Sequence, residues 1–139
     1  MKDQNHESLV FVLKMNRASF LFTGDADAAA EQEILADQQK RGNSPDSGLF
    51  PSPVDVLKIG HHGSKTSTSA EWLAAWKPKT AVISAGVNNM YRHPHPDVVA
   101  RIKRYDALIF RTDLQGEVQM KVSPKGGISL RTKLAHANE

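Results

Sequence analysis

The stretch from Val54 to Ser69 constrains the fold of this chain more than any other. It opens with a short apolar segment, Val54–Ile59, that has the composition of a buried strand, and it continues directly into GHHG at residues 60–63. A strand that ends in a glycine-flanked polar turn presents its next side chains at the rim of a sheet. Two imidazoles at such a rim are suited to hold a metal ion or to contact a phosphate group.

A second apolar segment, Ser19–Thr23, ends in the same way, at Gly24 and Asp25. The two strand ends together offer one carboxylate and one or two imidazoles, which is the ligand chemistry of a divalent cation. Asp25 has an equally good alternative role as the N-cap of a following helix, and each of its oxygens could serve one role. Successive residues of an extended chain point in opposite directions, so one histidine of the pair would face a metal and the other would support it.

Length and composition restrict the kind of domain and the ligand types that such a site can have. With 139 residues and a hydrophobic fraction of 40%, the chain can form one compact domain or half of a larger one. It has no cysteine, which excludes thiolate ligands and disulfides, and its net charge of +3 permits an anionic substrate without requiring one. We find no apolar run that could cross a bilayer and no signal peptide, and we therefore expect a soluble segment that makes no membrane contact of its own.

Hydrophobic periodicity and turn residues predict an α/β order of elements. We expect a hairpin at Asn16-Arg17, a capping box formed by Thr68 and Glu71, and a surface loop at residues 40–53. The predicted strands cover residues 8–14, 19–23, 54–59, 80–84, 107–112, 117–122 and 128–132, and the predicted helices cover residues 26–39, 70–76 and 97–105.

Two further groups of polar residues have competing interpretations. His93, His95 and Asp97 are spaced as in a metal motif, but the two intervening prolines also explain the pattern as a rigid entry into a helix. We favour the helix entry for His95 and Asp97 and regard the two roles of His93 as equal. Ser64 begins a hydroxyl-rich run that suits either phosphate binding or a polar cap. A triad of Ser64, His62 and Asp25 is disfavoured, because residues so close in sequence rarely reach that geometry.

Taken together, these pieces resemble the metallo-β-lactamase fold, and within it the C-terminal domain of the ComEC family of competence DNA-uptake proteins. The stretches that carry the resemblance occur in the family's order and are NHESLV at 5–10, FLFTGD at 20–25, DVLKIGHHGS at 55–64, AVIS at 81–84 and residues 88–94. The resemblance implies an αββα sandwich, of which residues 1–139 would form a single partial domain, the C-terminal half.

The resemblance also implies roles for individual residues. Asp25 matches an aspartate that bridges two metal ions, His62 matches a ligand of the second ion, and His61 would be its neighbour. Asn88, Tyr91 and His93 match a loop that borders the active site and contacts the substrate, as Ser64 also would. Two divalent ions, Zn²⁺ or Mn²⁺, about 3.5–4 Å apart would activate a water and stabilise charge on a phosphodiester.

One departure from the family limits what the chain can do alone. The main metal motif of the fold, H-x-H-x-D-H, belongs to the first half of the domain, and the segment at His93 lacks its final histidine. The chain therefore carries about two of the expected ligands, and its half-fold would expose a sheet face and a sheet edge. We expect it to associate with another copy or with the rest of a longer polypeptide.

The resulting hypothesis is part of a metal-dependent hydrolase that cleaves phosphodiester bonds in DNA, as a nuclease linked to DNA uptake in competence and transformation. In the family this domain belongs to an inner or plasma membrane protein, and a cytoplasmic location is the alternative. Two rival functions remain open. One is a non-catalytic binding or structural remnant of the fold, and the other is a stand-alone hydrolase of small molecules.

Overall fold

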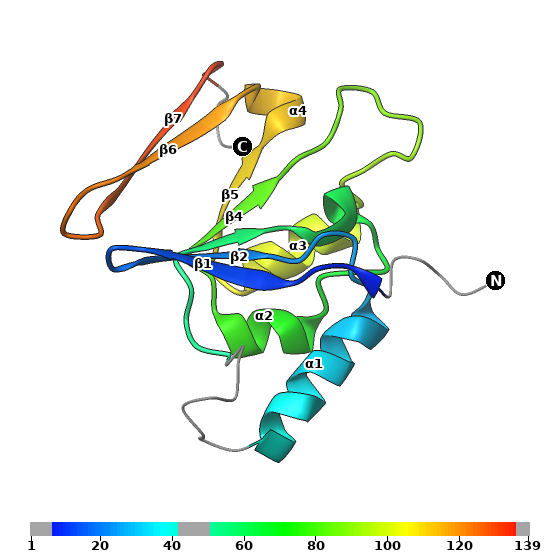
Figure 1. Ribbon diagram of the computed structural model, residues 1–139. Coiled ribbons are helices and arrows are strands. Elements are labelled where there is room, and N and C mark those ends of the chain that lie inside the picture. Colours follow the sequence, from blue (N-terminus) through cyan, green and yellow to red (C-terminus); the bar gives the residue numbers. More distant parts are fainter. Residues whose placement is uncertain (1–6, 42–50, 136–139) are drawn as a thin grey trace.

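The computed structural model describes residues 7–41 and 51–135, which form a mixed sheet with helices on one side and a β-hairpin on the other (Figure 1). The strands are β1 (Phe11–Met15), β2 (Ala18–Phe22), β3 (Val56–Lys58), β4 (Thr80–Ile83), β5 (Leu108–Arg111), β6 (Val118–Val122) and β7 (Ile128–Thr132). The helices are α1 (Ala28–Arg41), the short η2 (Gly60–Gly63), α2 (Ala70–Trp76), α3 (Pro96–Arg104) and α4 (Thr112–Gln115). The α/β class expected from the sequence is confirmed.

The main sheet has the strand order β1-β2-β3-β4-β5. The β1–β2 pair is the antiparallel hairpin predicted at Asn16-Arg17, and the three other pairs are parallel. Parallel pairing brings the carboxyl ends of β2, β3 and β4 to one edge. The turns that follow these strands therefore gather at that edge, as the sequence indicated.

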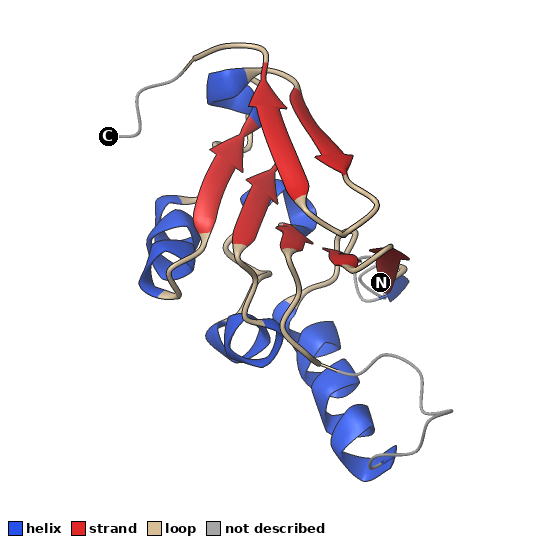
Figure 2. Cartoon of the chain, turned by 90° about the vertical axis from the view of Figure 1, so that its left-hand side faces the viewer, coloured by secondary structure: helices blue, strands red, loops and turns tan. Residues whose placement is uncertain are grey.

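One face of the sheet is covered by helices. Leu21, Leu57 and Ala81 lie in register across β2, β3 and β4, so their side chains share a face, and all three are fully buried. Figures 1 and 2 show α1, α2 and α3 on this side. The tryptophans Trp72 and Trp76 of α2 pack against each other there, with ring centroids 5.5 Å apart. This layer holds the hydrophobic core.

The opposite face is also apolar but is less completely covered. The β6–β7 hairpin lies over it and leaves a half-open cleft of about 220 Å³, which is lined by Phe20, Phe22, Lys58, Val82 and Met120 among others. The edge strand β1 leaves Phe11, Leu13 and Met15 between 42% and 49% exposed. The edge strand β1 is thus exposed, whereas the hairpin partly covers the apolar face that we expected to be open.

Local capping differs from the sequence prediction in two places. Helix α1 begins at Ala28 and not at Ala26, because Asp27 caps it, with Oδ1 accepting the amide of Ala30 at 2.8 Å. Ser69, not Thr68, caps α2 by accepting the amide of Trp72 at 3.2 Å. Most of the predicted loop at 40–53, and the Asn5-His6 start of the family-like stretch, lie outside the described residues.

Candidate functional site

The turn after β2 presents Asp25. Gly24 adopts a φ of +53°, and a Cβ at this position would lie 3.3 Å from the Cβ of Ser8, so a side chain is strained and crowded there. The hydroxyl of Ser8 accepts the amide hydrogen of Asp25 at 3.1 Å and fixes the turn. Because Asp27 is the helix cap, the carboxylate of Asp25 is left without a hydrogen bond among the described residues. The capping alternative for Asp25 is therefore wrong.

The turn after β3 presents the two histidines. His61 and His62 both have left-handed backbone conformations, with φ of 47° and 56°. The expectation of an extended chain with alternating side chains is therefore wrong, and a tight turn takes its place. The amide of His61 donates to the carbonyl of Gly24 at 2.9 Å. This bond ties the histidine turn directly to the Asp25 turn on the neighbouring strand.

The two imidazoles have different environments. Nδ1 of His62 lies 2.8 Å from the carbonyl oxygen of Ser84, at the end of β4. A carbonyl can only accept, so Nδ1 is the donor, and in the neutral form of this exposed ring Nε2 is the nitrogen with the lone pair. A second nitrogen held by a carbonyl is the usual support of a metal-binding histidine. Nδ1 of His61, in contrast, is buried with no partner among the described residues, which is uncommon for a polar atom.

His93 joins the histidine turn from the loop that follows β4. Its ring meets that of His61 edge-on with centroids 5.9 Å apart, and Tyr91 stacks on its other side at 5.8 Å. Burial, assisted by the nearby His61, His62 and His95, lowers the pKa of His93 and favours a neutral imidazole.

Two contacts hold this loop against the histidine turn. Asn89 brackets His93 by donating to its carbonyl at 2.6 Å and accepting its amide at 2.9 Å. The amide of His95 donates to the carbonyl of Gly63 at 2.8 Å. A Cβ on Gly63, whose φ is +83°, would lie 2.5 Å from the Cβ of Pro94, so only glycine allows this approach.

The remaining candidates lie as follows. Nδ1 of His95 accepts the amide of Asp97 at 3.2 Å and caps α3, which is the role that we favoured for this pair. Ser64 is buried, and its hydroxyl pairs with that of Thr66 at 3.0 Å, whereas Asn88 and Tyr91 are exposed. The hydroxyl of Ser64 makes no bond to His62, so the described residues contain no triad of the disfavoured kind.

Sequence reasoning missed a buried carboxylate next to the site. Glu31 of α1 accepts the amides of Thr68 at 2.6 Å and Ser69 at 2.9 Å, and Arg101 of α3 donates to the carbonyl of Thr68 at 2.8 Å. Burial raises the pKa of Glu31, while these hydrogen bonds and the charge of Arg101 act in the opposite direction. The group joins two helices to the segment that follows the histidine turn. The only hint in the sequence is that a glutamate occupies an inward-facing position of the helix, and no local motif identifies such a position.

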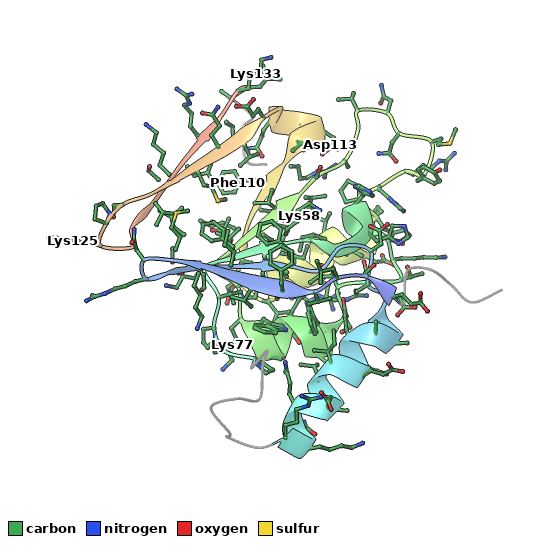
Figure 3. All side chains as sticks on the ribbon, in the orientation of Figure 1. Lys58, Lys77, Phe110, Asp113, Lys125 and Lys133 are labelled. Atoms are coloured by element: carbon green, nitrogen blue, oxygen red, sulfur yellow. The ribbon has the colours of Figure 1, made fainter. Side chains whose placement is uncertain are left out.

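Lys58 was also missed. It lies on the apolar side of the sheet that faces the hairpin, as Phe110 does (Figure 3), and its ammonium donates to the carbonyl of Ile59 at 2.9 Å. Burial lowers the pKa of Lys58, and the negative charge of Asp25 acts to raise it. A cation therefore stands close enough to the Asp25 turn to influence its charge.

The donor set is suitable for a metal but is incomplete. Within residues 7–41 and 51–135, no group of three or more histidine, cysteine, aspartate or glutamate side chains is arranged to hold an ion. Asp25 and His62 nevertheless have the features of ligands, a free carboxylate and an imidazole with a fixed tautomer. These two donors suit a divalent ion in kind, but within the described residues they are too few to hold one.

Sequence comparison places this geometry in a class. Residues 1–87, which include both the Asp25 turn and the histidine turn, match the profile of the metallo-beta-lactamase superfamily. The chain therefore belongs to that superfamily, whose members generally bind divalent metals.

The relatives define a narrower family. The chain is 38% identical over 125 residues to ComE operon protein 3 of Bacillus subtilis, 36% over 116 residues to Recombination protein 2 of Haemophilus influenzae and 36% over 126 residues to Competence protein ComA of Neisseria gonorrhoeae. These matches cover 84–91% of this chain and confirm the ComEC family.

The chain spans only 13–17% of the length of these relatives, as a segment of a longer polypeptide would. Among the described residues, no helix is both long enough and apolar enough to cross a membrane.

Proposed function

We propose that this chain is part of a metal-dependent hydrolase domain that cleaves phosphodiester bonds in DNA, as a nuclease linked to competence DNA uptake. The observation that carries the proposal is the bond between the amide of His61 and the carbonyl of Gly24, at 2.9 Å. It joins the turns that present Asp25 and His62, the two side chains best prepared to act as ligands. Metal chemistry of this superfamily gives the reaction type, and the competence relatives favour DNA as the substrate.

In this proposal, Asp25 and His62 hold a divalent ion, Zn²⁺ or Mn²⁺, with further ligands from the rest of a longer polypeptide. A metal pair in such a site supplies an activated water and charge stabilisation for phosphodiester cleavage. Ser84 keeps Nδ1 of His62 protonated, so that Nε2 is the nitrogen available for coordination. Asp25 is half-buried, its negative charge acts to raise the pKa of Lys58, and His61 lines the turn.

In the same proposal, the loop that follows β4 binds the substrate. Asn88 and Tyr91 are exposed on the loop after β4, where Tyr91 stacks on His93, and would contact the DNA strand. His93, kept neutral by burial, can donate or accept one hydrogen bond to a phosphate oxygen or to the leaving group. Ser64 supports the turn through Thr66 and offers a phosphate contact only if that pairing opens.

The test measures metal affinity before activity. Calorimetric titration with Zn²⁺ and Mn²⁺ compares the domain with its preceding residues restored against Asp25→Asn and His62→Ala, with His95→Ala as the matched control because His95 caps α3. We expect each ligand variant to weaken binding at least about tenfold and the control to leave it unchanged. Cleavage of DNA in Mn²⁺ or Zn²⁺ should fall in the same order.

Other results would support the rival functions. Equal metal affinity in all variants, with no cleavage of any phosphodiester, contradicts the proposal and favours a non-catalytic remnant. That alternative has a specific observation behind it, the lack of a three-ligand group among the described residues. Turnover of a small chromogenic phosphodiester without attack on DNA would instead favour a small-molecule hydrolase.

A further inference from the structure

The outward face of the β6–β7 hairpin is strongly basic. Residues 117–133 contain four basic residues and one acidic residue, and this net charge of +3 equals the formal net charge of all 139 residues. The four cations are Lys121, Lys125, Arg131 and Lys133. Figure 3 shows Lys125 at the tip of the hairpin and Lys133 at its opposite end, so the charge extends along its whole length.

Strand pairing explains why the charge lies on one face. Met120 pairs with Leu130 and Val122 with Ile128, and these half-buried side chains point toward the main sheet. The intervening positions Gln119, Lys121, Ser129 and Arg131 are all exposed, because alternate residues of a strand point to opposite faces. The hairpin is therefore apolar toward the sheet and polar and basic toward solvent.

The β1–β2 turn adds a further cation beside the tip of the hairpin. The side-chain amide of Asn16 donates to the carbonyl of Ser123 at 2.9 Å, and a Cβ on Gly126 would lie 2.5 Å from the Cβ of Arg17. These contacts hold Arg17 against the tip of the hairpin. We call the combined surface the basic stripe, and its members are Arg17, Lys121, Lys125, Arg131 and Lys133.

The cations of the basic stripe are not neutralised within the protein. In the part of the chain that the structure describes, none of the five forms an ion pair. Arg131 donates to the uncharged amide oxygen of Gln119 at 2.6 Å, and the nearby carboxylate of Glu117 accepts from the same Gln119. One carboxylate, that of Glu117 across from Lys133, also lies on this face, so five cations against one anion leave an excess of positive charge that favours an anionic ligand.

We propose that the basic stripe binds the phosphate backbone of a DNA strand and holds that strand on the chain that carries the candidate hydrolytic site. Outward positions of β7 such as Ser129 and Arg131 repeat about every 6.7 Å, which is comparable to the phosphate spacing of an extended single strand, and Lys133 follows just beyond the end of β7. Residues 117–133 contain no aromatic side chain, so bases have no stacking platform. Binding is therefore independent of sequence and strongly dependent on salt.

The choice of DNA over an anionic membrane rests on the proposed function and on one observation of the surface. None of the outward positions Gln119, Lys121, Ser129 and Arg131 carries a large apolar side chain that could insert among lipids. The stripe offers charge alone, along a line, which matches a polyanionic strand.

The test measures anisotropy of a fluorescent single-stranded oligonucleotide in EDTA, where no metal-dependent cleavage occurs. The triple variant Lys121→Gln, Arg131→Gln, Lys133→Gln is compared with Lys40→Gln, Lys77→Gln, Lys103→Gln, whose exposed cations lie in or beside the helix layer. Both variants lose the same charge. We expect the stripe variant to bind at least about tenfold more weakly at low salt, with its salt slope smaller by about two, and the control to bind like the parent.

Equal weakening in both triples would show a net-charge effect and overturn the proposal, as would unchanged binding in the stripe variant. Tighter binding to phosphatidylserine vesicles than to the oligonucleotide, lost in the same variant, would assign the stripe to a membrane instead. Circular dichroism and thermal unfolding verify that each variant is folded. Because binding is measured without metal, loss of cleavage in the Asp25 and His62 variants with stripe binding intact would separate the two proposals.

Discussion

Both faces of the main sheet are apolar, but only one is completely covered within the described residues. The face toward α1, α2 and α3 buries Trp72, Trp76 and Leu57 completely. The face toward the β6–β7 hairpin keeps a half-open cleft of about 220 Å³, and Leu13 and Met15 at its edge are 44% and 49% exposed. The comparison teaches that the helix side holds the fully buried core, whereas the hairpin side leaves apolar side chains partly exposed.

The largest loss of stability should come from a substitution on the face that the helices cover. Trp76→Ala removes a fully buried indole, and we expect the free energy of unfolding to fall by about 3–5 kcal/mol, as measured by urea denaturation. Its Nε1 has no hydrogen-bond partner among the described residues, so the loss is one of packing. Phe20→Ala, on the half-covered face, serves as the matched control and should cost clearly less. Equal losses would mean that the two faces contribute equally.

A smaller effect should come from the carboxylate that joins the helix layer to the site. Glu31→Gln leaves one oxygen to accept from two buried amides, those of Thr68 and Ser69, and we expect a loss of about 1–3 kcal/mol. Asp37→Asn, in an exposed ion pair with Arg41, is the control and should change stability by less than about 0.5 kcal/mol.

The pH dependence of stability provides a second test of the role of Glu31. Burial raises the pKa of Glu31 above 4.5, so the unfolded chain releases this proton first as the pH rises. The Glu31 contribution to stability therefore decreases from pH 4.5 upward until the raised pKa is passed, and it is constant above that point. Glu31→Gln should remove this decrease from the stability profile, and an unchanged profile would contradict the assignment.

The sequence predicted seven strands and the three longer helices because their periodicity is local, but it placed the first strand at 8–14 and missed the short η2 and α4. It also predicted that the Asp25 and histidine turns would gather at one edge, since parallel strands share an edge for their carboxyl ends. It could not predict the tautomer of His62, which depends on the carbonyl of Ser84 on another strand. The docking of the loop at His93 depends likewise on the fit between Gly63 and Pro94.

The errors have the same origin. Asp25 and Asp27 are equally good caps by residue type, and only the path of the chain after Gly24 selects Asp27. Thr68 looked like the cap of α2, but Glu31 from another helix holds its amide and leaves the capping role to Ser69. For Thr68 and Ser69 a long-range contact therefore decided between two nearly equal local choices.

A third effect on stability should appear at low pH and should come from Asp55, which precedes β3. Burial acts to raise the pKa of Asp55, but hydrogen bonds from Ser19 and Lys79 prevail and lower it below 3.8. The stabilisation is therefore present above pH 3.8 and is lost as the pH falls through the lowered pKa. Asp55→Asn should flatten the acid limb of the stability profile, by an amount smaller than the Glu31→Gln loss. An unchanged acid limb would show that other carboxylates control it.

The smallest effect on stability, and the clearest separation of the two faces, should come from the exposed edge strand. Leu13→Ser and Met15→Ser remove apolar groups that are already 44% and 49% exposed. Each substitution should therefore change the free energy of unfolding by less than about 0.5 kcal/mol. The double variant should, however, bind less of a hydrophobic dye and self-associate less in sedimentation, because β1 is a sheet edge with an apolar face. Leu73→Ser, on the covered face, is the opposite control and should unfold the chain without that gain. If the edge variant is as destabilised as this control, β1 belongs to the core and the hairpin side is not an open surface.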